Sequence, residues 1–272
     1  MRKVLTYDID ELVPYVNWIY FHFAWGMDGK PNAEKEDLRQ EAVAMLTAWQ
    51  GVYHAKAVFR LMEANSDGDD LVLEGIRLPL LRQQRLSHEG APCLCLADFV
   101  RPLSSGKKDK VGLFCATMGN SVMEIREGDD YKKMMAQTLS DRLAEAAAER
   151  MHEEVRRHYW GYAPAERLTM EEIHAGHYQG IRPAVGYPSL PDTSVNFILQ
   201  ELLNINEIGV RLSESGMMVP HASVSGLMIA HPQAHYFELG RIGEDQLRDY
   251  ARRRGVPVET ARRFLQSSLI KR

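Results

Sequence analysis

Cysteine, long apolar runs and excess positive charge are all scarce in this 272-residue chain. Its three cysteines cannot all pair, and a cytosolic protein keeps such thiols reduced. No apolar run approaches the roughly 20 residues that span a bilayer, and residues 1–8 lack the apolar segment of a signal peptide. The net charge of −4 argues against bulk binding to nucleic acid. The sequence therefore predicts a cytoplasmic protein that has neither a membrane nor a nucleic acid as its partner.

Several familiar motifs for chemistry are also missing. There is no G-x-G-x-x-G after a predicted strand, no G-x-x-x-x-G-K-[ST] and no G-x-S-x-G, so the sequence supports neither a dinucleotide fold, a P-loop nor a nucleophile elbow. His174 and His177 form H-x-x-H without a glutamate between them, which is usually incidental. Cys93, Cys95 and Cys115 lack C-x-x-C spacing and are expected to be core thiols. We therefore expect no metal site.

The composition and the order of the predicted elements indicate the fold class. With 45% hydrophobic and 26% charged residues, the chain has the composition of a globular protein that forms one large domain or two small ones. Strands are predicted in hairpin-like clusters between long helices, and they do not alternate strictly with helices. This order predicts an α+β fold in which long helices flank a mostly antiparallel, twisted sheet.

Apolar periodicity and turn signals set the ranges of these elements. The expected helices are 32–50, 129–159, 193–205, 243–254 and 258–269. The expected strands lie in a hairpin at 55–75, in a pair at 93–100 and 110–117, and within 208–239. The helix at 129–159 begins with acidic residues and ends with basic ones, which suits the helix dipole.

One stretch, residues 178–192, concentrates proline, glycine and tyrosine around a single arginine. Each proline fixes its own φ and restrains the residue before it, so the backbone around Arg182 should be stiff. Gly186 can adopt a positive φ or let backbone N–H groups approach a ligand closely. A stiff loop that holds one guanidinium suits a small anion, but the pattern is equally typical of a proline-rich crossover on the surface. The stretch alone favours neither interpretation.

Other candidate residues have ordinary explanations when each is considered alone. Glu145 follows Arg142 by three residues on the long predicted helix, which is the spacing of an exposed ion pair. Asp10 precedes an aromatic stretch and can cap a helix. Tyr236 and Phe237 follow a turn and lead into a predicted strand.

Taken together, these residues and the motifs around them resemble one family. The matching segments run in order from about residue 9 to near the C-terminus: 96–100, 105–107, 141–146, 159–164, 178–188, 222–226, 231–232 and 249–253. The specific motifs are Arg-Pro-x-x-Gly-Tyr-Pro at 182–188 and Tyr-Trp-Gly-Tyr-Ala-Pro at 159–164. The chain resembles the C-terminal activation domain of cobalamin-dependent methionine synthase. The resemblance implies a single domain over residues 1–272, with a helical subregion at about 126–175 packed on the sheet.

The resemblance also implies a function. In this family the domain binds S-adenosylmethionine and presents its methyl group for the reductive methylation of cob(II)alamin to methylcobalamin. The electron comes from flavodoxin or a flavoprotein reductase, and cobalamin is supplied by a partner domain or chain. This sequence has no D-x-H-x-x-G cobalamin-binding motif, so we expect part of a methyltransferase that is not catalytically complete alone.

The same resemblance implies which residues bind S-adenosylmethionine. Arg182 would bind the carboxylate, for which a guanidinium fork suits better than an ammonium, and Asp10 would accept from the ammonium group. The backbone at Ala184 and Gly186 would contact adenine and ribose. The other residues expected at the ligand are Glu145, Tyr187, Tyr236 and Phe237. Aromatic rings favour a nearby sulfonium, and methyl transfer relies on positioning, so no general acid or base is expected.

Two other functions stay open at this point. One is a docking domain for flavodoxin or a cobalamin protein that binds no ligand. Basic tail residues, among them Arg252, Arg253 and Arg263, could then face an acidic partner, although solvated helix faces explain them as well. The other is a self-sufficient methyltransferase for a small molecule, which would usually carry a glycine-rich loop after its first strand, and that loop is missing.

Overall fold

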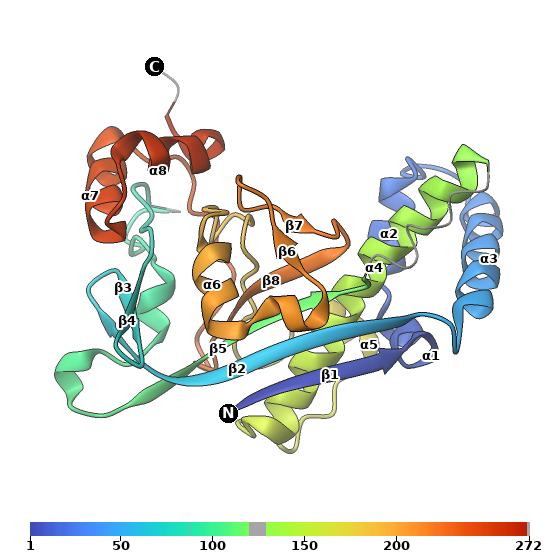
Figure 1. Cartoon of the computed structure of the whole chain (residues 1–272), viewed down its shortest axis with the longest axis horizontal. Coiled ribbons are helices and arrows are strands. Elements are labelled where there is room, and N and C mark those ends of the chain that lie inside the picture. Colours follow the sequence, from blue (N-terminus) through green and yellow to red (C-terminus); the bar gives the residue numbers. More distant parts are fainter. Residues whose placement is uncertain (87, 120–128, 271–272) are drawn as a thin grey trace.

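The computed structural model describes residues 1–86, 88–119 and 129–270, and an antiparallel sheet forms its centre (Figure 1). The six-stranded sheet has the order β4-β3-β2-β5-β8, with β1 paired to β2 beside this path. The strands are β1 Arg2–Asp8, β2 His54–Asp67, β3 Asp70–Leu73, β4 Ile76–Pro79, β5 Asp109–Thr117 and β8 Ser223–Met228. A separate pair joins β6 Arg211–Leu212 and β7 Met218–Val219. All of these pairings are antiparallel, which confirms the predicted fold class.

Helices flank this sheet. The α-helices are α1 Ile9–Leu12, α2 Trp18–Ala24, α3 Asn32–Trp49, α4 Asp130–Glu154, α5 Met170–His174, α6 Val195–Leu203, α7 Glu244–Arg254 and α8 Val258–Phe264. Short 3₁₀ turns lie at Val13–Tyr15, Leu96–Phe99, Leu103–Ser105, Ile205–Ile208 and Gln266–Ser268. The predicted helices at 32–50, 193–205 and 243–254 are confirmed within two residues at their ends, and the helix at 129–159 is confirmed as α4 with the turn that follows it. The helix predicted at 258–269 is confirmed only as far as Phe264, beyond which the chain forms the 3₁₀ turn Gln266–Ser268.

The longest of the described helices, α4, has a capped start and a widened end. The Asp129 side chain accepts a hydrogen bond from the Tyr131 N–H at 3.1 Å and thereby caps the helix. After Glu154 the helix continues as a π-helical turn, Val155–Tyr159, and the chain leaves it at Gly161, whose φ is +73°. The predicted helix thus extends to its expected end, but its last turn is wider than an α-helical one.

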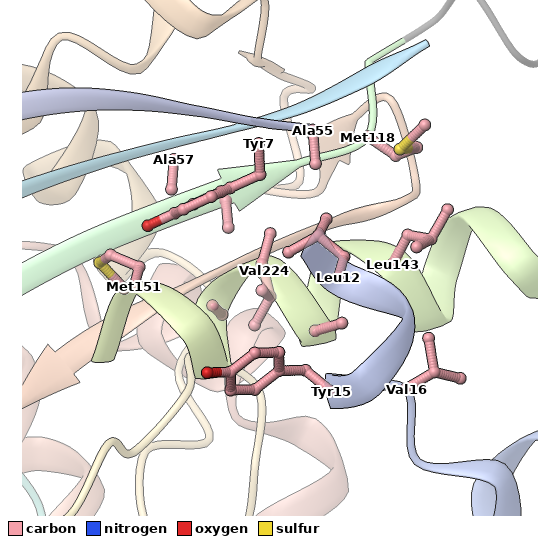
Figure 2. Close-up of a cluster of buried hydrophobic side chains, with 14 of the residues drawn as sticks. Tyr7, Leu12, Tyr15, Val16, Ala55, Ala57, Met118, Leu143, Met151 and Val224 are labelled. Carbon is pink, nitrogen blue, oxygen red and sulfur yellow. The ribbon is translucent and has the colours of Figure 1, made fainter. Parts of the chain in front are cut away.

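Alternation along the strands places α4 and α6 on opposite faces of the sheet (Figure 1). In β2, Ala57 and Phe59 join the cluster around α4, whereas Val58 joins the cluster that contains α6. Figure 2 shows the first of these clusters, where side chains of the N-terminal segment, such as Leu12 and Tyr15, gather with those of the sheet around α4. Both faces of the sheet are therefore buried.

The predicted strand at 93–100 is wrong. Cys95 makes only an isolated bridge to Arg82, and Leu96–Phe99 is a 3₁₀ turn. The carboxylate of Asp98 accepts from the Cys95 N–H at 2.8 Å and from the Arg82 guanidinium, which closes a turn that the apolar alternation did not indicate. The strand predicted to pair with it exists as β5, but β5 lies between β2 and β8.

The C-terminal helices form a third buried cluster at the end of the sheet, where α7 contacts β4. Arg253 is committed to this packing, because it binds the carboxylates of Asp249 and Asp70 and donates to the Leu80 carbonyl. No helix in the described ranges is both long and apolar enough to cross a bilayer. The cytoplasmic location stays a prediction.

Candidate functional site

A cavity of about 730 Å³ opens beside the middle of α4. Segments far apart in the sequence line it: the turn and helix start at residues 15–20, α4, residues 173–178, residues 182–189 and residues 236–238. The charged residues of its lining are Arg142, Glu145, Glu149, Arg182 and Glu238. Its volume is that of an ordinary small-molecule site.

Residues 178–192, here called the arginine loop, reach this cavity because residues 181–185 pair with the edge of the sheet. Ile181 exchanges backbone hydrogen bonds of 2.9 and 3.0 Å with Ile229, and Val185 N–H donates to the Ser225 carbonyl at 2.9 Å. Pro183 lies between them, and its carbonyl accepts from Leu227 N–H at 3.0 Å. At an edge position the missing N–H of a proline leaves no gap in the sheet. The interpretation of residues 181–185 as a free surface crossover is therefore excluded.

Glycine in β8 permits the close approach. A Cβ at Gly226 would lie 2.2 Å from the Pro183 carbonyl oxygen and 2.9 Å from Ala184 Cα. Further along, Gly186 has φ +88° and donates its N–H to the Leu190 carbonyl at 2.8 Å, so the loop turns back on itself. Gly226 therefore lets the loop approach β8 closely, and Gly186 lets the loop reverse its direction.

The Arg182 side chain is only 9% exposed, and it projects from this edge segment toward α4. Its Nη2 lies 2.8 Å from Glu149 Oε2, and its guanidinium carbon lies 5.4 Å from the centre of the Phe114 ring. Burial lowers the pKa of Arg182, but the Glu149 carboxylate and its neighbours outweigh this, so the pKa is raised above its ordinary value. Arg182 is therefore a fixed positive charge in the cavity wall.

One tyrosine holds the backbone of Arg182, and a second tyrosine contacts the first. The Tyr236 hydroxyl accepts from the Arg182 N–H at 2.9 Å and lies 3.2 Å from the Tyr178 hydroxyl. Burial, and then the Glu149 carboxylate, raise the pKa of Tyr178, which keeps its hydroxyl protonated. The segment that carries Tyr236 is thereby tied to the arginine loop.

Glu145 and Tyr187 meet at the open side of the cavity. The Tyr187 hydroxyl donates to Glu145 Oε1 at 3.2 Å, and Tyr187 is 54% exposed. The Glu145 carboxylate, and then burial, raise the pKa of Tyr187 to about 12. The pairing with Arg142 that the spacing allowed is not the hydrogen bond that Glu145 makes here.

The structure brings most of the residues named by the resemblance to one place. Those that line the cavity are Glu145, Arg182, Ala184, Tyr187, Tyr236 and Phe237. Gly186 lies in the same loop but outside the lining, and its N–H is already used. Asp10 is exposed in α1 and is not part of the lining either. It does not cap the helix, because Asp8 is at the N-cap and its N–H donates to Glu11.

Several lining residues were missed by sequence reasoning. They are Tyr15, Asn17, Tyr20, Arg142, Glu149 and Tyr178, with residues 173–176 at the C-terminal end of α5. Glu149 had a readable signal, because it follows Glu145 by four residues and so lies on the same helix face. Asn17 had none, because a cap residue is common at helix starts, and here its side chain accepts from Ile19 N–H at 3.1 Å.

The site has the chemistry for a ligand that carries both charges. Guanidiniums suit a carboxylate, whereas the glutamates suit an ammonium, and the tyrosine rings suit an apolar or cationic group. Within the described ranges, no group of three or more His, Cys, Asp or Glu side chains is placed to hold a metal ion. His174 instead lies 3.1 Å from the Tyr15 carbonyl.

Comparisons with known proteins agree with this geometry. The family model for the activation domain of vitamin B12-dependent methionine synthase matches residues 8–255. The crystal structure of the MetH reactivation domain bound to AdoHcy is similar with a TM-score of 0.94 and 36% sequence identity, over 100% of this chain and 91% of that chain. By its sequence and its fold, this chain belongs to the family of vitamin B12-dependent methionine synthase activation domains.

Proposed function

We propose that the cavity binds S-adenosylmethionine and presents its methyl group to cobalamin held by a partner domain or chain. The observation that carries this proposal is the placement of Arg182, three glutamates and five tyrosines around one cavity of about 730 Å³. The similar MetH reactivation domain was crystallised with AdoHcy, the demethylated form of this ligand, which supports the same ligand class here. We also propose that residues 1–272 act as one unit.

The ligand's charged groups can be matched to named residues. The carboxylate binds the Arg182 guanidinium, and the ammonium binds Glu145, the exposed-side carboxylate of the cavity. Glu145 takes the role expected of Asp10, because Asp10 lies outside the lining. Tyr187, Tyr236 and Phe237 contact the adenosyl group and the sulfonium.

The methyl group leaves a sulfonium, so the reaction needs no proton transfer by the chain. Its residues bind and orient the donor, and their placement around the cavity keeps water from the buried part of the ligand. Bound cobalamin supplies the metal-centred acceptor for the methyl group. No residue of this chain is proposed as a catalytic acid or base.

Cobalamin is proposed to approach over α2, beside the cavity. Ile19, Tyr20 and Phe23 of this helix are 78, 60 and 69% exposed, and Tyr20 also belongs to the cavity lining. Exposed apolar side chains that continue from a ligand site are typical of an interaction surface. We expect Phe23→Asp to slow methyl transfer to a cobalamin-binding domain without weakening the binding of S-adenosylmethionine, because Phe23 is not part of the lining.

A flavodoxin or a flavoprotein reductase is proposed as the electron donor. Fewer unpaired arginines of the tail are available to this electron donor than the sequence indicated. Arg253 and Arg262 bind carboxylates of this chain. Arg263 is exposed and stacks on Phe264. Loss of reductive coupling in Arg263→Glu, with ligand binding retained, would support a contact at this helix.

Calorimetric titration of S-adenosylmethionine tests the central proposal. We compare the wild-type chain, Arg182→Ala and the control Arg211→Ala, which removes an exposed arginine from β6. A hydrogen bond between charged groups contributes about 1.5–3 kcal/mol. We therefore expect the affinity for S-adenosylmethionine to fall about 10- to 100-fold in Arg182→Ala and to be unchanged in the control. Absence of binding to the folded wild-type chain, in the presence and in the absence of the cobalamin-binding domain, would refute it and favour a docking domain.

A further inference from the structure

Glu149 lies between two buried guanidiniums, although only one of them holds it. Its Oε2 is 2.8 Å from Arg182 Nη2, whereas its Oε1 is 4.0 Å from Arg156 Nη1. The side chains of Arg156, Arg182 and Glu149 are 0, 9 and 12% exposed. One carboxylate thus faces two cations in a place that water scarcely reaches.

Two polar atoms of the Glu149–Arg182 pair form no hydrogen bond. Among the described residues, neither Glu149 Oε1 nor Arg182 Nε has a hydrogen-bond partner. Buried polar atoms of this kind are rarely left unpaired in a finished site. Nε and Nη2 form one edge of a guanidinium, and a carboxylate that binds this edge with both oxygens needs both groups. Glu149 already binds Nη2, so a ligand carboxylate on this edge would lie beside a second buried carboxylate. Repulsion between the two like charges favours a movement of Glu149.

Arg156 is held in place and offers Glu149 an alternative partner. Its Nε and Nη2 bind Glu166 at distances between 2.6 and 3.1 Å, and its Nη1 lies 2.9 Å from His152 Nδ1. Its guanidinium carbon also lies 4.2 Å from the centre of the Tyr178 ring. Because Nη1 carries two N–H groups and His152 takes one, the other is free to bind Glu149 after a shift of about 1 Å.

We propose that Glu149 is an exchangeable internal partner of Arg182, and that it transfers to Arg156 when the carboxylate of the ligand binds. This inference rests on the proposed function and specifies how its site discriminates. In the empty site Glu149 neutralises Arg182, which avoids a buried unpaired charge. In the occupied site the ligand carboxylate takes its place. Glu149 is therefore a positioning residue that sets how strongly the site selects ligands with a carboxylate.

The test compares two ligands that differ only in this group. S-adenosylmethionine and its decarboxylated form share the adenosyl group, the sulfonium and the ammonium. The dissociation constant of the decarboxylated form is divided by that of S-adenosylmethionine, both measured by calorimetry. This ratio reports the contribution of the carboxylate and cancels the other contacts. In Glu149→Gln the competing charge is gone while the volume is kept, so we expect this ratio to rise about tenfold over that of the wild type.

Two further variants separate exchange from other roles. Glu154→Gln removes a partly buried carboxylate of the same helix, which pairs with Arg150 at 3.1 Å outside the cavity, and should leave the ratio within about twofold. Arg156→Lys keeps the charge but cannot reach Glu166, His152 and Glu149 together, so in a folded variant the ratio should fall.

The outcomes are distinct. A ratio in Glu149→Gln that equals or falls below the wild-type value would overturn the exchange, because Glu149 would then be a structural or direct ligand contact. This holds whether or not Arg156→Lys folds. If the wild-type chain binds neither ligand, the proposed function itself has failed. If it binds S-adenosylmethionine and only the ratio stays constant, the function stands and the exchange does not.

Discussion

The hydroxyl of Tyr236 accepts a hydrogen bond from the backbone N–H of Arg182 at 2.9 Å, across 54 residues of sequence. Neighbouring N–H groups of this segment pair with β8, so the N–H of Arg182 points away from the sheet and depends on a side chain. Tyr236 therefore has a structural role that the resemblance, which placed it at the ligand, did not include.

Tyr236→Phe should weaken both the fold and the site. It removes the acceptor of the Arg182 N–H and the partner of the Tyr178 hydroxyl, so we expect a loss of about 0.5–1.5 kcal/mol in the free energy of unfolding. The affinity for S-adenosylmethionine should fall about tenfold because the Arg182 backbone is less fixed. Denaturant titration and calorimetry measure these effects. Tyr131→Phe, which loses a hydrogen bond to Glu41 outside the cavity lining, is the control and should leave the affinity unchanged.

Gly226→Ala should displace the arginine loop. The added methyl would lie 2.2 Å from a backbone oxygen, which cannot move without breaking the pairing of residues 181–185 with β8. Overpacking of this kind costs about 1–3 kcal/mol, and we expect ligand affinity to fall with it.

The matched control for that change is Gly112→Ala in the neighbouring strand. Its methyl would meet side-chain atoms of Met228 and Leu61, the nearest at 2.7 Å, rather than the loop. It should therefore cost stability with a smaller loss of affinity. Equal losses of affinity in the two variants would show that Gly226 has no special relation to the site.

Much of the fold could be predicted from the sequence, because its elements depend on local periodicity. The helix at 32–50 and the β2–β3 hairpin follow from apolar spacing and from a Gly–Asp turn. The stretch at 93–100 failed because its apolar alternation competes with Asp98, whose carboxylate closes a turn. The pairing of residues 181–185 with β8 was also not predicted, since prolines argue against strands.

The site was predicted where a motif carries it and missed where tertiary contacts do. Arg182 and Tyr187 lie in a recognisable loop. Glu149 looks like any charged helix residue until Arg182 is placed beside it. Tyr178 gains its role from Tyr236 and Arg156, neither of which is its neighbour in sequence.

His152 predicts a pH dependence of stability. It is fully buried, and burial, followed by the charges of Arg156 and Arg182, holds its pKa well below the ordinary value. Arg156 can only donate, so His152 Nδ1 accepts and the ring is neutral. The unfolded chain takes up this proton near pH 6.5 and the folded chain does not. The free energy of unfolding should therefore fall below about pH 6.5, by up to about 1.4 kcal/mol per pH unit.

Denaturant titrations between pH 7.5 and pH 5 measure this slope. His152→Gln keeps an acceptor for Arg156 but cannot titrate. The free energy of unfolding of this variant should therefore change less with pH, by the contribution of about one proton, which is about 1.4 kcal/mol per pH unit. His158→Gln, which changes an exposed histidine, should keep the wild-type slope. Identical slopes in all three proteins would contradict a neutral, buried His152.

Tyr250→Phe tests whether the tail belongs to the same folding unit. The Tyr250 hydroxyl donates to Asp192 Oδ2 at 2.6 Å, and Asp192 is 2% exposed. Losing this bond leaves a buried carboxylate with fewer donors, for which we expect a loss of about 1–3 kcal/mol. A single, cooperative transition shifted as a whole would fit one unit. A transition that splits, with the tail melting first, would argue against the single-domain prediction.

The pairing of residues 181–185 with β8 also bears on self-association. An uncovered strand at the border of a sheet is a template for strands of other molecules. Here the loop that carries Arg182 covers that border, so the segment proposed to hold the ligand also shields the protein from its own copies. Changes that release this loop should therefore promote aggregation as well as impair binding, and a bound ligand should protect against both.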